Sequence, residues 1–418
     1  MLIKILINEL NMFVTLLKLL PPTLLVNSVK SFAMVLVFML PTVYAQLQAQ
    51  PEIRKIAPLK LEAVNLGQKI ICYRPTRHGI PNMTVTKLGD KVIAHNYGHS
   101  GSGWTLAPGA IAYVNELLQK SEYATDLKPD TPITIIGAGV MGLWSAYDLI
   151  ERGYNNITII ADQFDGLASN NAGGLLKPSF MDYPPNARPM MNKIAVNAYK
   201  VYSAIAKKQQ SNFIDGAVIM PAYFPTREES DLEPYVTAGV MQSAKDVVLD
   251  FGNGTTRVMV AYDDGILINV PKMMISLTTY LKNKKVPFIK NKIQNFAEIK
   301  TKYIVDCTGL GAKELDNDNA MTPGQGHLIM LKNQDPENVK YLISVNLGNG
   351  KTSSRQTVNW YFYMHPKHLP SSSTDDVGVI GGTFIEGATP QTPNEEQFDL
   401  IVERARSFYG IDASKAKK

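Results

Sequence analysis

The most informative segment of the chain is Ile133-Thr-Ile-Ile-Gly137-Ala-Gly139-Val-Met-Gly142-Leu-Trp-Ser-Ala-Tyr, which is followed by an apolar run at 157–160 and by Asp162. This pattern predicts a strand, a tight turn, a helix and a second strand. Gly137 permits the turn, Gly139 lets the backbone approach a pyrophosphate, and Gly142 lets the helix pack closely against the strand. We therefore expect a dinucleotide site here, and the alternative is a turn with a structural role alone.

The predicted helix and second strand supply the remaining contacts of such a site. Unpaired N–H groups at the helix N-terminus, which include those of Val140 and Met141, attract the diphosphate. Asp162, 20 residues beyond Gly142, can accept hydrogen bonds from the adenosine ribose and disfavours a 2′-phosphate. NAD and FAD both fit this unit, so other segments must decide between them.

The composition places the chain among globular proteins of enzyme size. It has 418 residues, of which 45% are hydrophobic and 19% are charged. The formal charge of +5 is small and the lysines are scattered, which argues against nucleic acid as a partner. Cys72 and Cys307 are the two cysteines, so neither a disulfide framework nor a Cys-x-x-Cys site is expected. Beyond residue 45, strand and helix patterns alternate, as in a mixed α/β chain.

The first 45 residues differ from the rest of the chain. Lys30 precedes an apolar run at 32–43, and Val43 and Ala45 match the spacing of a signal-peptide cleavage site. We expect an exported protein, periplasmic or secreted, with cleavage after Ala45. The alternatives are an uncleaved membrane anchor, which the apolar stretch 12–26 favours, and a cytoplasmic protein whose true start lies further along. The membrane would be a partner in the anchored case alone.

Segments on the C-terminal side of the phosphate loop share a further pattern. They are Ala161-Asp-Gln163-Phe164, Ser169-Asn-Asn-Ala-Gly173-Gly174-Leu175, Val286–Ile293, Cys307-Thr308-Gly309, Pro323-Gly-Gln325-Gly-His327, Gly381–Gly387 and Glu403–Gly410. In letters and spacing they resemble the D-amino-acid oxidase family. The matching parts of that family are its second strand and flavin-side loop, its adenine-side strand, its CTG strand end, its PGRGQ segment, and a strand and helix of its substrate domain. The resemblance implies that the dinucleotide is FAD.

Two further family segments stand before the phosphate loop. Tyr73-Arg74-Pro75-Thr-Arg77 resembles the family's RPxR strand, and His95-Asn-Tyr-Gly98-His-Ser-Gly101-Ser-Gly103-Trp104-Thr105 resembles its flavin segment HNYGHGGYGLT. The family normally carries both near its C-terminal end. A helix over 107–120 and a surface loop over 123–130 would join them to the dinucleotide unit. We therefore expect a circularly permuted chain, with its new ends between Gly410 and about Cys72.

The resemblance implies an α/β fold with a Rossmann-like FAD-binding domain and a second domain on a mixed or antiparallel sheet, in permuted chain order. The FAD-binding domain would take residues 86–180 and 251–330. The substrate domain would take residues 46–85, 181–250 and 331–418, after a signal peptide or anchor at 1–45.

By the same resemblance, Arg74 holds the carboxylate of an amino-acid substrate, a task that suits a planar guanidinium with two parallel hydrogen bonds. The alternatives are an ion pair with a structural role for Arg74, or the clamp role for Arg77. Tyr363 and Tyr361 would supply the second carboxylate contact, unless this aromatic strand packs in the core. Gly101 would complete the active site from the glycine-rich flavin segment.

The cofactor-binding residues that the resemblance implies come from several separate segments. They are Gly137, Gly139, Val140, Met141 and Gly142; Asp162 and Gln163; Ser169, Gly173, Gly174 and Leu175; Ile293, Thr308 and Gly309; and Gly101, Ser102, Gly103, Trp104 and Thr105. The last segment would place backbone N–H groups and the Thr105 hydroxyl near the pyrimidine edge of the flavin. His95 and His99 stand four apart, but the glycines and serines around them argue against a helix and a metal site.

The implied reaction is FAD-dependent oxidative deamination of a D-amino acid. A hydride leaves Cα for the flavin, O2 is reduced to H2O2, and a 2-oxo acid and ammonia are the products. Two other classes stay open. One is a related flavin enzyme that oxidises glycine or another amine, or that passes electrons to a quinone. The other is a non-catalytic FAD-binding protein, which departures from the family pattern at Asn359, Gln163 and Gln325 favour.

Overall fold

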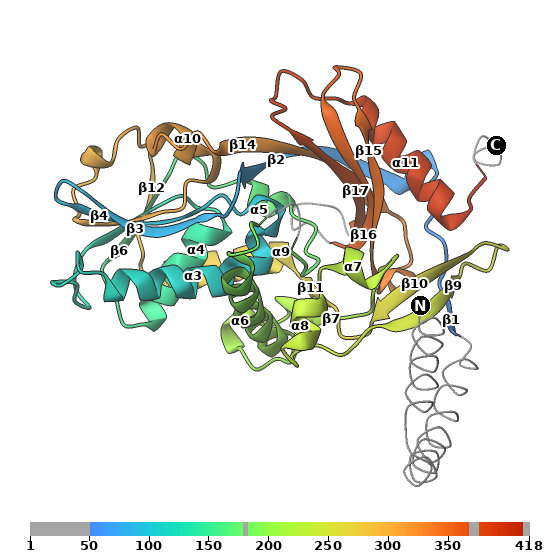
Figure 1. Cartoon of the computed structure of the whole chain (residues 1–418), viewed down its shortest axis with the longest axis horizontal. Helices are drawn as coiled ribbons and strands as arrows, with labels where there is room; N and C mark the ends of the chain where they lie inside the picture. The colour runs from blue at the N-terminus through green and yellow to red at the C-terminus, as the bar shows by residue number, and fades with distance from the viewer. Residues whose placement is uncertain (1–50, 179–182, 368–375, 413–418) are drawn as a thin grey trace, which may run out of the picture. The chain divides into compact units, whose positions relative to one another are not determined.

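The computed structural model describes residues 51–178, 183–367 and 376–412. The expected signal peptide or anchor at 1–45 lies outside these residues. From Ile53 onward the chain forms one compact unit, built on a six-stranded sheet, a nine-stranded sheet and a small two-stranded sheet (Figure 1). Among the described residues, no helix combines the length and the apolar character needed to cross a membrane.

The six-stranded sheet contains the dinucleotide unit. Its strands, in spatial order, are β12 (Phe288–Lys290), β6 (Ile157–Ala161), β5 (Ile133–Ile136), β13 (Tyr303–Asp306), β4 (Lys91–Tyr97) and β3 (Asn82–Leu88). The first five run parallel, and β3 forms an antiparallel hairpin with β4. β4 and β5 are buried along their whole length, as expected for central strands of a parallel sheet that is covered on both faces.

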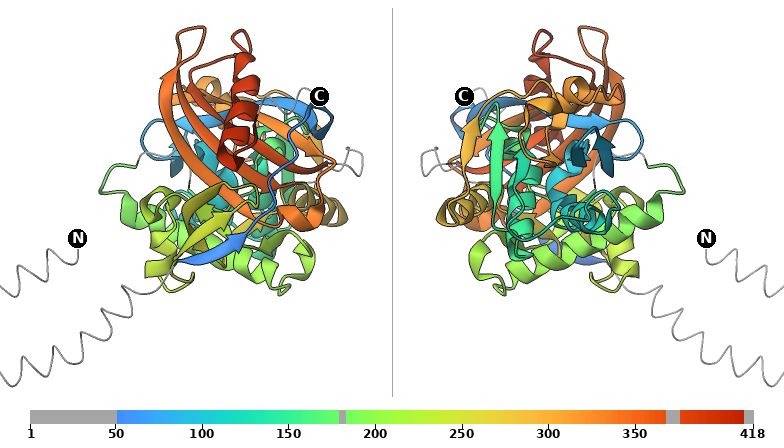
Figure 2. Two further views of the ribbon diagram at one scale, coloured as in Figure 1. Left: turned by 90° about the vertical axis from the view of Figure 1, so that its right-hand side faces the viewer. Right: turned by 90° about the vertical axis from the view of Figure 1, so that its left-hand side faces the viewer.

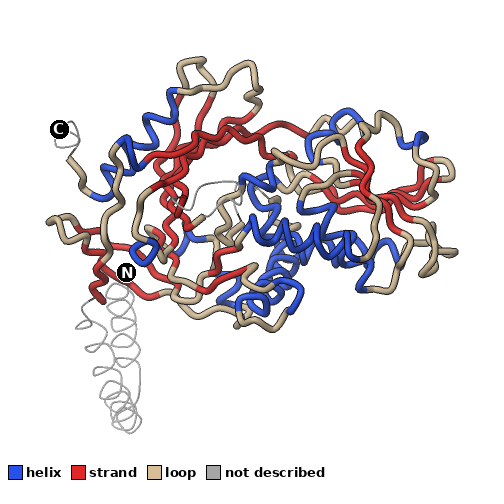
Figure 3. Tube along the Cα trace, turned by 180° about the vertical axis from the view of Figure 1, so that it is seen from behind, coloured by secondary structure: helices blue, strands red, loops and turns tan. Residues whose placement is uncertain are grey.

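Alternate residues of these strands face two separate cores, because the side-chain period along a strand is two. Ile135 and Val305 face one core, whereas Ile136 and Ile304 face the other and pack with Phe296. The first core is shared with α3 (Gly103–Lys120), α4 (Val140–Glu151), α6 (Arg188–Ala206) and α9 (Val270–Asn283). Figure 3 shows these helices grouped beside the strands of the six-stranded sheet.

The nine-stranded sheet contains most of the other strands. In spatial order they are β1 (Glu52–Lys55), β9 (Lys245–Asp250), β10 (Thr256–Tyr262), β8 (Ala222–Phe224), β15 (Leu342–Lys351), β16 (Thr357–Pro366), β17 (Asp376–Glu386), β14 (Met321–Lys332) and β2 (Leu66–Arg77). The sheet is mixed, because β8 and β15 run parallel whereas β15, β16, β17, β14 and β2 follow one another antiparallel. α11 (Glu396–Tyr409) packs against β14, β16 and β17 (Figure 1 and Figure 2).

The remaining elements are short. The helices α5 (Ala168–Asn171), α7 (Arg227–Ser230), α8 (Glu233–Thr237) and α10 (Ala312–Leu315) have four or five residues each. β7 (Ala217–Ile219) pairs with β11 (Ile266–Ile268). The 3₁₀ turn η2 (Ser100–Ser102) leads directly into α3.

The segment before the phosphate loop contributes to both large sheets. β2 pairs with β14 in the nine-stranded sheet, and β3, β4 and α3 complete the six-stranded sheet and its helices. Sheet membership differs from the expected domain boundaries in two places. β3 begins at Asn82, before the expected boundary at 86. β10 and β14 lie in the nine-stranded sheet, although β10 and most of β14 fall within 251–330. β10 forms a hairpin with β9, which a boundary at 251 would cut.

Candidate active site

A cavity of about 1340 Å³ is lined by residues of both the dinucleotide unit and the nine-stranded sheet. Its walls come from the glycine turn, the ends of β6 and β13, the loop after β6, and side chains on β2 and β16. Residues 71–75 and most of 96–105, which precede the phosphate loop in the sequence, also line it. Sites for drug-sized ligands usually measure about 300–1,000 Å³. The larger volume here suits a dinucleotide together with a small substrate.

Two glycines of the turn are required by their surroundings. Gly137 has a φ of +111°, and a Cβ there would lie 2.4 Å from the carbonyl oxygen of Cys307. A Cβ on Gly142 would lie 1.9 Å from the carbonyl oxygen of Gly137, so α4 packs directly on the turn. Gly142 acts through this packing and does not line the cavity. The other predicted residues of the turn do line it: Gly137, Gly139, Val140 and Met141.

The N-terminus of α4 presents an anion-binding surface to the cavity. Gly139 is the N-cap and has no side chain to satisfy the first N–H groups of the helix. The Val140 N–H donates to Ser169 Oγ over 2.9 Å, which shows that this helix end already holds an oxygen acceptor. The free N–H groups and the helix dipole form a cradle that fits a diphosphate.

Five predicted cofactor residues lie just beyond the carboxyl ends of parallel strands, and all of them line the cavity. They are Asp162 and Gln163 after β6, Ile293 after β12, and Thr308 and Gly309 after β13. Open α/β sheets bind their ligands at these strand ends. The placement therefore agrees with a nucleotide site.

The start of α3 and the loop after β6 are joined at the cavity wall. Trp104 Nε1 donates to the Ser169 carbonyl oxygen over 2.9 Å, and Thr105 Oγ1 donates to the Lys177 carbonyl oxygen over 2.9 Å. The Thr105 hydroxyl thus binds the backbone of this loop, and Thr105 also lines the cavity. Ser102 is fully buried outside the cavity wall. The other predicted residues of these segments line the cavity: Gly101, Gly103, Trp104, Thr105, Ser169, Gly173, Gly174 and Leu175.

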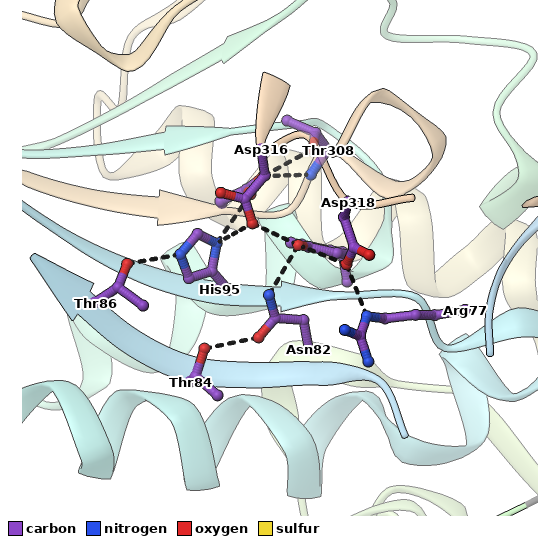
Figure 4. A network of polar contacts seen from close by, with 10 residues as sticks. Arg77, Asn82, Thr84, Thr86, His95, Thr308, Asp316 and Asp318 are labelled. Carbon is purple, nitrogen blue, oxygen red and sulfur yellow. Dashed lines mark hydrogen bonds and ion pairs between the residues drawn. The ribbon is translucent and has the colours of Figure 1, made fainter. Parts of the chain in front are cut away.

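A polar network supports the end of β13 (Figure 4). His95 on β4 places Nδ1 3.2 Å from Asp306 Oδ2 and 3.4 Å from Asp316 Oδ2. The other oxygen of Asp306 accepts hydrogen bonds from the Thr308 N–H at 3.1 Å and from the Thr308 hydroxyl at 2.7 Å. The network therefore fixes a residue of the cavity wall.

The same network bears on the expected absence of a metal site. His95, Asp306 and Asp316 offer three ligand atoms within 4.8 Å of one another, an arrangement that could hold a cation. His99 is not a member of this set, so the spacing of His95 and His99 has no joint role in it. Both carboxylates already accept hydrogen bonds, Asp316 from the Tyr97 hydroxyl at 2.6 Å. We assign the cluster a supporting role at the strand ends.

Arg74 reaches the cavity from β2. Its Nη1 donates to the Thr383 carbonyl oxygen over 3.0 Å, and a Cβ on Gly326 of β14 would lie 2.4 Å from both Nη atoms. Arg77 has a different environment, because its Nε donates to Asp318 over 2.7 Å. Of the two candidate clamps, Arg74 lines the cavity and Arg77 does not.

Tyr361 and Tyr363 lie on the cavity face of β16. The Tyr363 ring packs against Gly381, where a Cβ would lie 2.4 Å from the hydroxyl oxygen. Burial raises the pKa of Tyr363 and the charge of Arg74 opposes this, so the hydroxyl stays protonated at neutral pH. Burial also raises the pKa of Tyr361, on which Arg74 and Asp231 act in opposite directions. Both tyrosines can therefore donate a hydrogen bond near Arg74.

Two departures from the family pattern, Gln325 and Asn359, lie on strands of the nine-stranded sheet. Gln325 is fully buried on β14, where its Nε2 donates to the Thr392 carbonyl oxygen over 2.9 Å and its Oε1 accepts from Asn394 Nδ2 over 2.8 Å. Asn359 lies opposite Asn349 in the β15–β16 pair. Neither Gln325 nor Asn359 lines the cavity.

Several polar residues of the cavity wall were not predicted from the sequence, among them His365, Lys177 and Asp231. His365 could have been found, because it continues the alternation of Tyr361 and Tyr363 along one strand. Lys177 Nζ lies 3.3 Å from Asp231 Oδ2, and the two residues come from distant parts of the sequence. No local pattern points to this pair.

Comparison with known proteins identifies the class that this fold and cavity define. Residues 132–416 match the model of the DAO family, described as FAD dependent oxidoreductase. The match covers more than half of the chain, and the chain belongs to this family of FAD-dependent oxidoreductases. FAD is therefore its cofactor, and the glycine turn with the N-terminus of α4 fits the diphosphate of that molecule.

Individual relatives are distant. A D-amino-acid oxidase of Streptomyces coelicolor is 23% identical over 299 residues, which cover 69% of this chain and 80% of the relative. A D-amino-acid oxidase of Dictyostelium discoideum is 25% identical over 215 residues, which cover 50% of this chain and 60% of the relative. Among solved structures, glycine oxidase from Geobacillus kaustophilus has a TM-score of 0.46 and 15% identity, and the match covers 67% of this chain and 78% of that chain.

Proposed function

We propose that the protein oxidises a D-amino acid to an imino acid, which water converts into a 2-oxo acid and ammonia, with O2 reduced to H2O2. The observation that carries this proposal is the position of Arg74 in the same cavity as the FAD cradle. A guanidinium in such a place is suited to a substrate carboxylate. Two relatives of the chain are named D-amino-acid oxidases, which supports an amino acid as the substrate.

The residues of this chain would bind and orient the substrate. The planar guanidinium of Arg74 can hold both carboxylate oxygens through two parallel hydrogen bonds. The protonated hydroxyl of Tyr363 can donate to the same carboxylate. With the carboxylate fixed, the direction of the Cα–H bond is restricted, and such positioning lowers the barrier to transfer. Bound FAD supplies the redox chemistry, as the acceptor of the hydride and the donor of electrons to oxygen.

A substrate panel tests the proposed reaction. It contains D- and L-amino acids, glycine and secondary amines. Turnover is measured as peroxide formation with O2 as the acceptor, and as reduction of the quinone when a quinone replaces O2. We expect peroxide from at least one D-amino acid and none from its L enantiomer. Activity with glycine or a secondary amine alone would favour a related amine oxidase. A flavin that no compound reduces would contradict catalysis and favour a protein that binds FAD without turnover.

We also propose that the chain order is a circular permutation of the family order. The family match spans 132–416, yet β4 and the cavity residues at 71–75 and 96–105 precede it in the chain. These earlier segments resemble parts that the family carries near its C-terminal end. The position of Arg74 beside Tyr363, which lies within the matched range, supports a rearranged order of otherwise equivalent parts.

The two ends that the proposed permutation creates lie close together. Arg406, near the end of α11, donates from Nη2 to the Leu61 carbonyl oxygen over 2.7 Å. Leu59 and Leu61 also share a hydrophobic core with Tyr409. The end of α11 and the approach to β2 are thus neighbours in space, as the ends created by a permutation must be.

A rearranged gene tests the permutation. It encodes residues 132–412, then a short linker, then residues 51–131, so that the family order is restored and β1 keeps its place beside β9. We expect soluble protein with full flavin content and a melting temperature within about 5 °C of the natural order. The matched control opens the chain inside β5 and should not fold. Flavin-free or insoluble protein from the restored order, with two different linker lengths, would contradict the permutation.

We propose further that residues 1–45 direct export. The basic Lys30, the apolar run 32–43 and the spacing of Val43 and Ala45 support this proposal. Cell fractionation and the mass of the purified product test it. Protein that begins at Gln46 and lies outside the cytoplasm is the expected result. Full-length protein in the membrane or the cytoplasm would contradict cleavage.

A further inference from the structure

His365 is a polar residue of the cavity that the chemistry above does not use. It lies two residues beyond Tyr363 on β16, and the two rings stack with centroids 5.0 Å apart and planes at 12°. Tyr361, Tyr363 and His365 form a row on one face of the strand, and all three line the cavity. The side chain of His365 belongs to the wall and not to the surface, because the residue is 6% exposed.

Neither ring nitrogen of His365 has a hydrogen-bond partner within the described part of the chain. The backbone of Gly173 abuts the ring, since a Cβ on Gly173 would lie 2.4 Å from Nδ1, and this backbone acts to raise the pKa of His365. Buried polar groups nearly always have partners, and a missing partner costs about 1–3 kcal/mol. A ligand in the cavity can supply the partner.

The His365 ring is neutral. Burial lowers the pKa of His365 to about 3, the charge of Lys367 acts in the same direction, and the Gly173 backbone opposes both. A neutral imidazole offers one N–H donor and one nitrogen acceptor. Its acceptor nitrogen can bind an amine or an ammonium group without charge repulsion.

The position of His365 fits the amino end of an amino-acid substrate. Arg74 and Tyr363 mark the carboxylate end on one side of the ring. On the other side, Lys367 Nζ donates to the Ala172 carbonyl oxygen over 2.7 Å and so holds the loop of Gly173, which resembles the family's flavin-side loop. His365 thus lies between the carboxylate end and the wall where the flavin is expected. The carbon that loses its hydrogen there also carries the amino group.

We propose that His365 accepts a hydrogen bond from the amino group of the substrate and so selects amino acids over carboxylates that lack an amine. The inference rests on the proposed oxidation of a D-amino acid. Arg74 and Tyr363 fix one substituent of Cα, and His365 fixes a second. Two fixed substituents set the direction of the Cα–H bond, which a carboxylate clamp alone leaves free to rotate.

Two substitutions test this contact in the holoenzyme. His365→Leu removes both nitrogens, and His365→Gln keeps a neutral donor and acceptor. Two ligands are compared. Binding of D-alanine is measured by anaerobic reduction of the flavin. Binding of propionate, which lacks the amine, is measured by the change in flavin absorption. We expect His365→Leu to weaken D-alanine binding about tenfold and propionate binding less than about twofold, and His365→Gln to retain most of the affinity for D-alanine.

A matched control comes from the surface. His78 is exposed, and its Nε2 lies 2.9 Å from Glu386 Oε1. His78→Leu therefore makes the same chemical change away from the cavity and should alter the binding of neither ligand. If His365→Leu does not fold, His365→Met replaces it as the apolar variant. Flavin content and melting temperature are recorded for every variant.

Three results from the variants would overturn the inference: unchanged D-alanine binding in His365→Leu, equal weakening of the binding of both ligands, or loss of flavin from both His365 variants, which would assign the residue to the cofactor. Failure of the proposed function is a separate result, in which no amino acid reduces the wild-type flavin. In that case the dissociation constants of D-alanine and propionate are both measured from the change in flavin absorption. The effect of His365→Leu on their ratio still tests the role of His365. A wild-type protein that binds neither ligand also overturns the inference.

Discussion

The Arg74→Ala variant is expected to keep its flavin but to need at least about a hundredfold more D-amino acid for half-maximal flavin reduction. Removal of one partner from a buried, hydrogen-bonded charge pair costs about 2–5 kcal/mol, and a hundredfold corresponds to about 2.8 kcal/mol. The truncation leaves the substrate carboxylate in the cavity without the guanidinium that faces it. Anaerobic reduction at a series of substrate concentrations measures the effect.

Two companion variants identify the cause of that loss. Arg74→Lys keeps the positive charge but not the planar fork, so its effect should be intermediate. Arg77→Ala removes the hydrogen bond to Asp318, which lies outside the cavity wall, and should lower stability by about 1 kcal/mol without changing the substrate requirement. Unchanged substrate dependence in Arg74→Ala, or a large change in Arg77→Ala, would contradict the assignment of the clamp.

The Gly142→Ala variant should lose flavin binding and be destabilised by about 3 kcal/mol or more. The added Cβ would lie 1.9 Å from the carbonyl oxygen of Gly137, a backbone atom that cannot move without the turn. α4 must then shift away from β5 and carry its N–H groups out of position. Flavin content after gel filtration and the free energy of unfolding in urea measure the two effects.

Gly153→Ala is the matched control for this prediction. Gly153 lies at the other end of α4 with a φ of +97°, and a Cβ there would meet no atom within 4 Å. The backbone conformation should cost about 1–2 kcal/mol, but the flavin should stay bound. If Gly142→Ala keeps its flavin and its stability, or if Gly153→Ala loses flavin as well, close packing of α4 on the turn does not explain the effect.

The dinucleotide unit could be predicted from the sequence because its signals are local. Gly137, Gly139 and Gly142 fix a turn between an apolar run and a helix, and β5, α4 and β6 follow at those positions. The helix expected over 107–120 begins earlier, at Gly103, because η2 leads directly into α3. Such differences at helix ends depend on the preceding turn and not on the helix sequence itself.

The remaining features depend on contacts between distant residues. From the sequence, Arg74 and Arg77 are rival candidates for the carboxylate clamp. In the structure Arg77 donates a hydrogen bond to Asp318, which precedes β14, and this contact favours Arg74 as the clamp. The hydrogen bond from the Thr105 hydroxyl to the Lys177 backbone, far along the chain, could not be predicted from the local sequence. Likewise, β10 forms a hairpin with β9 and so lies in the nine-stranded sheet, whereas the expected boundary at 251 assigned its residues to the FAD-binding domain.

The central claim is that this cavity holds FAD and presents a D-amino acid to it. The visible absorption spectrum of the purified protein, recorded without oxygen before and after addition of D-amino acids, tests this claim most directly. The expected result is a flavin band that bleaches with at least one D-amino acid and not with its L enantiomer. A protein without a flavin band would contradict the cofactor assignment, and a band that no D-amino acid bleaches would contradict the proposed reaction.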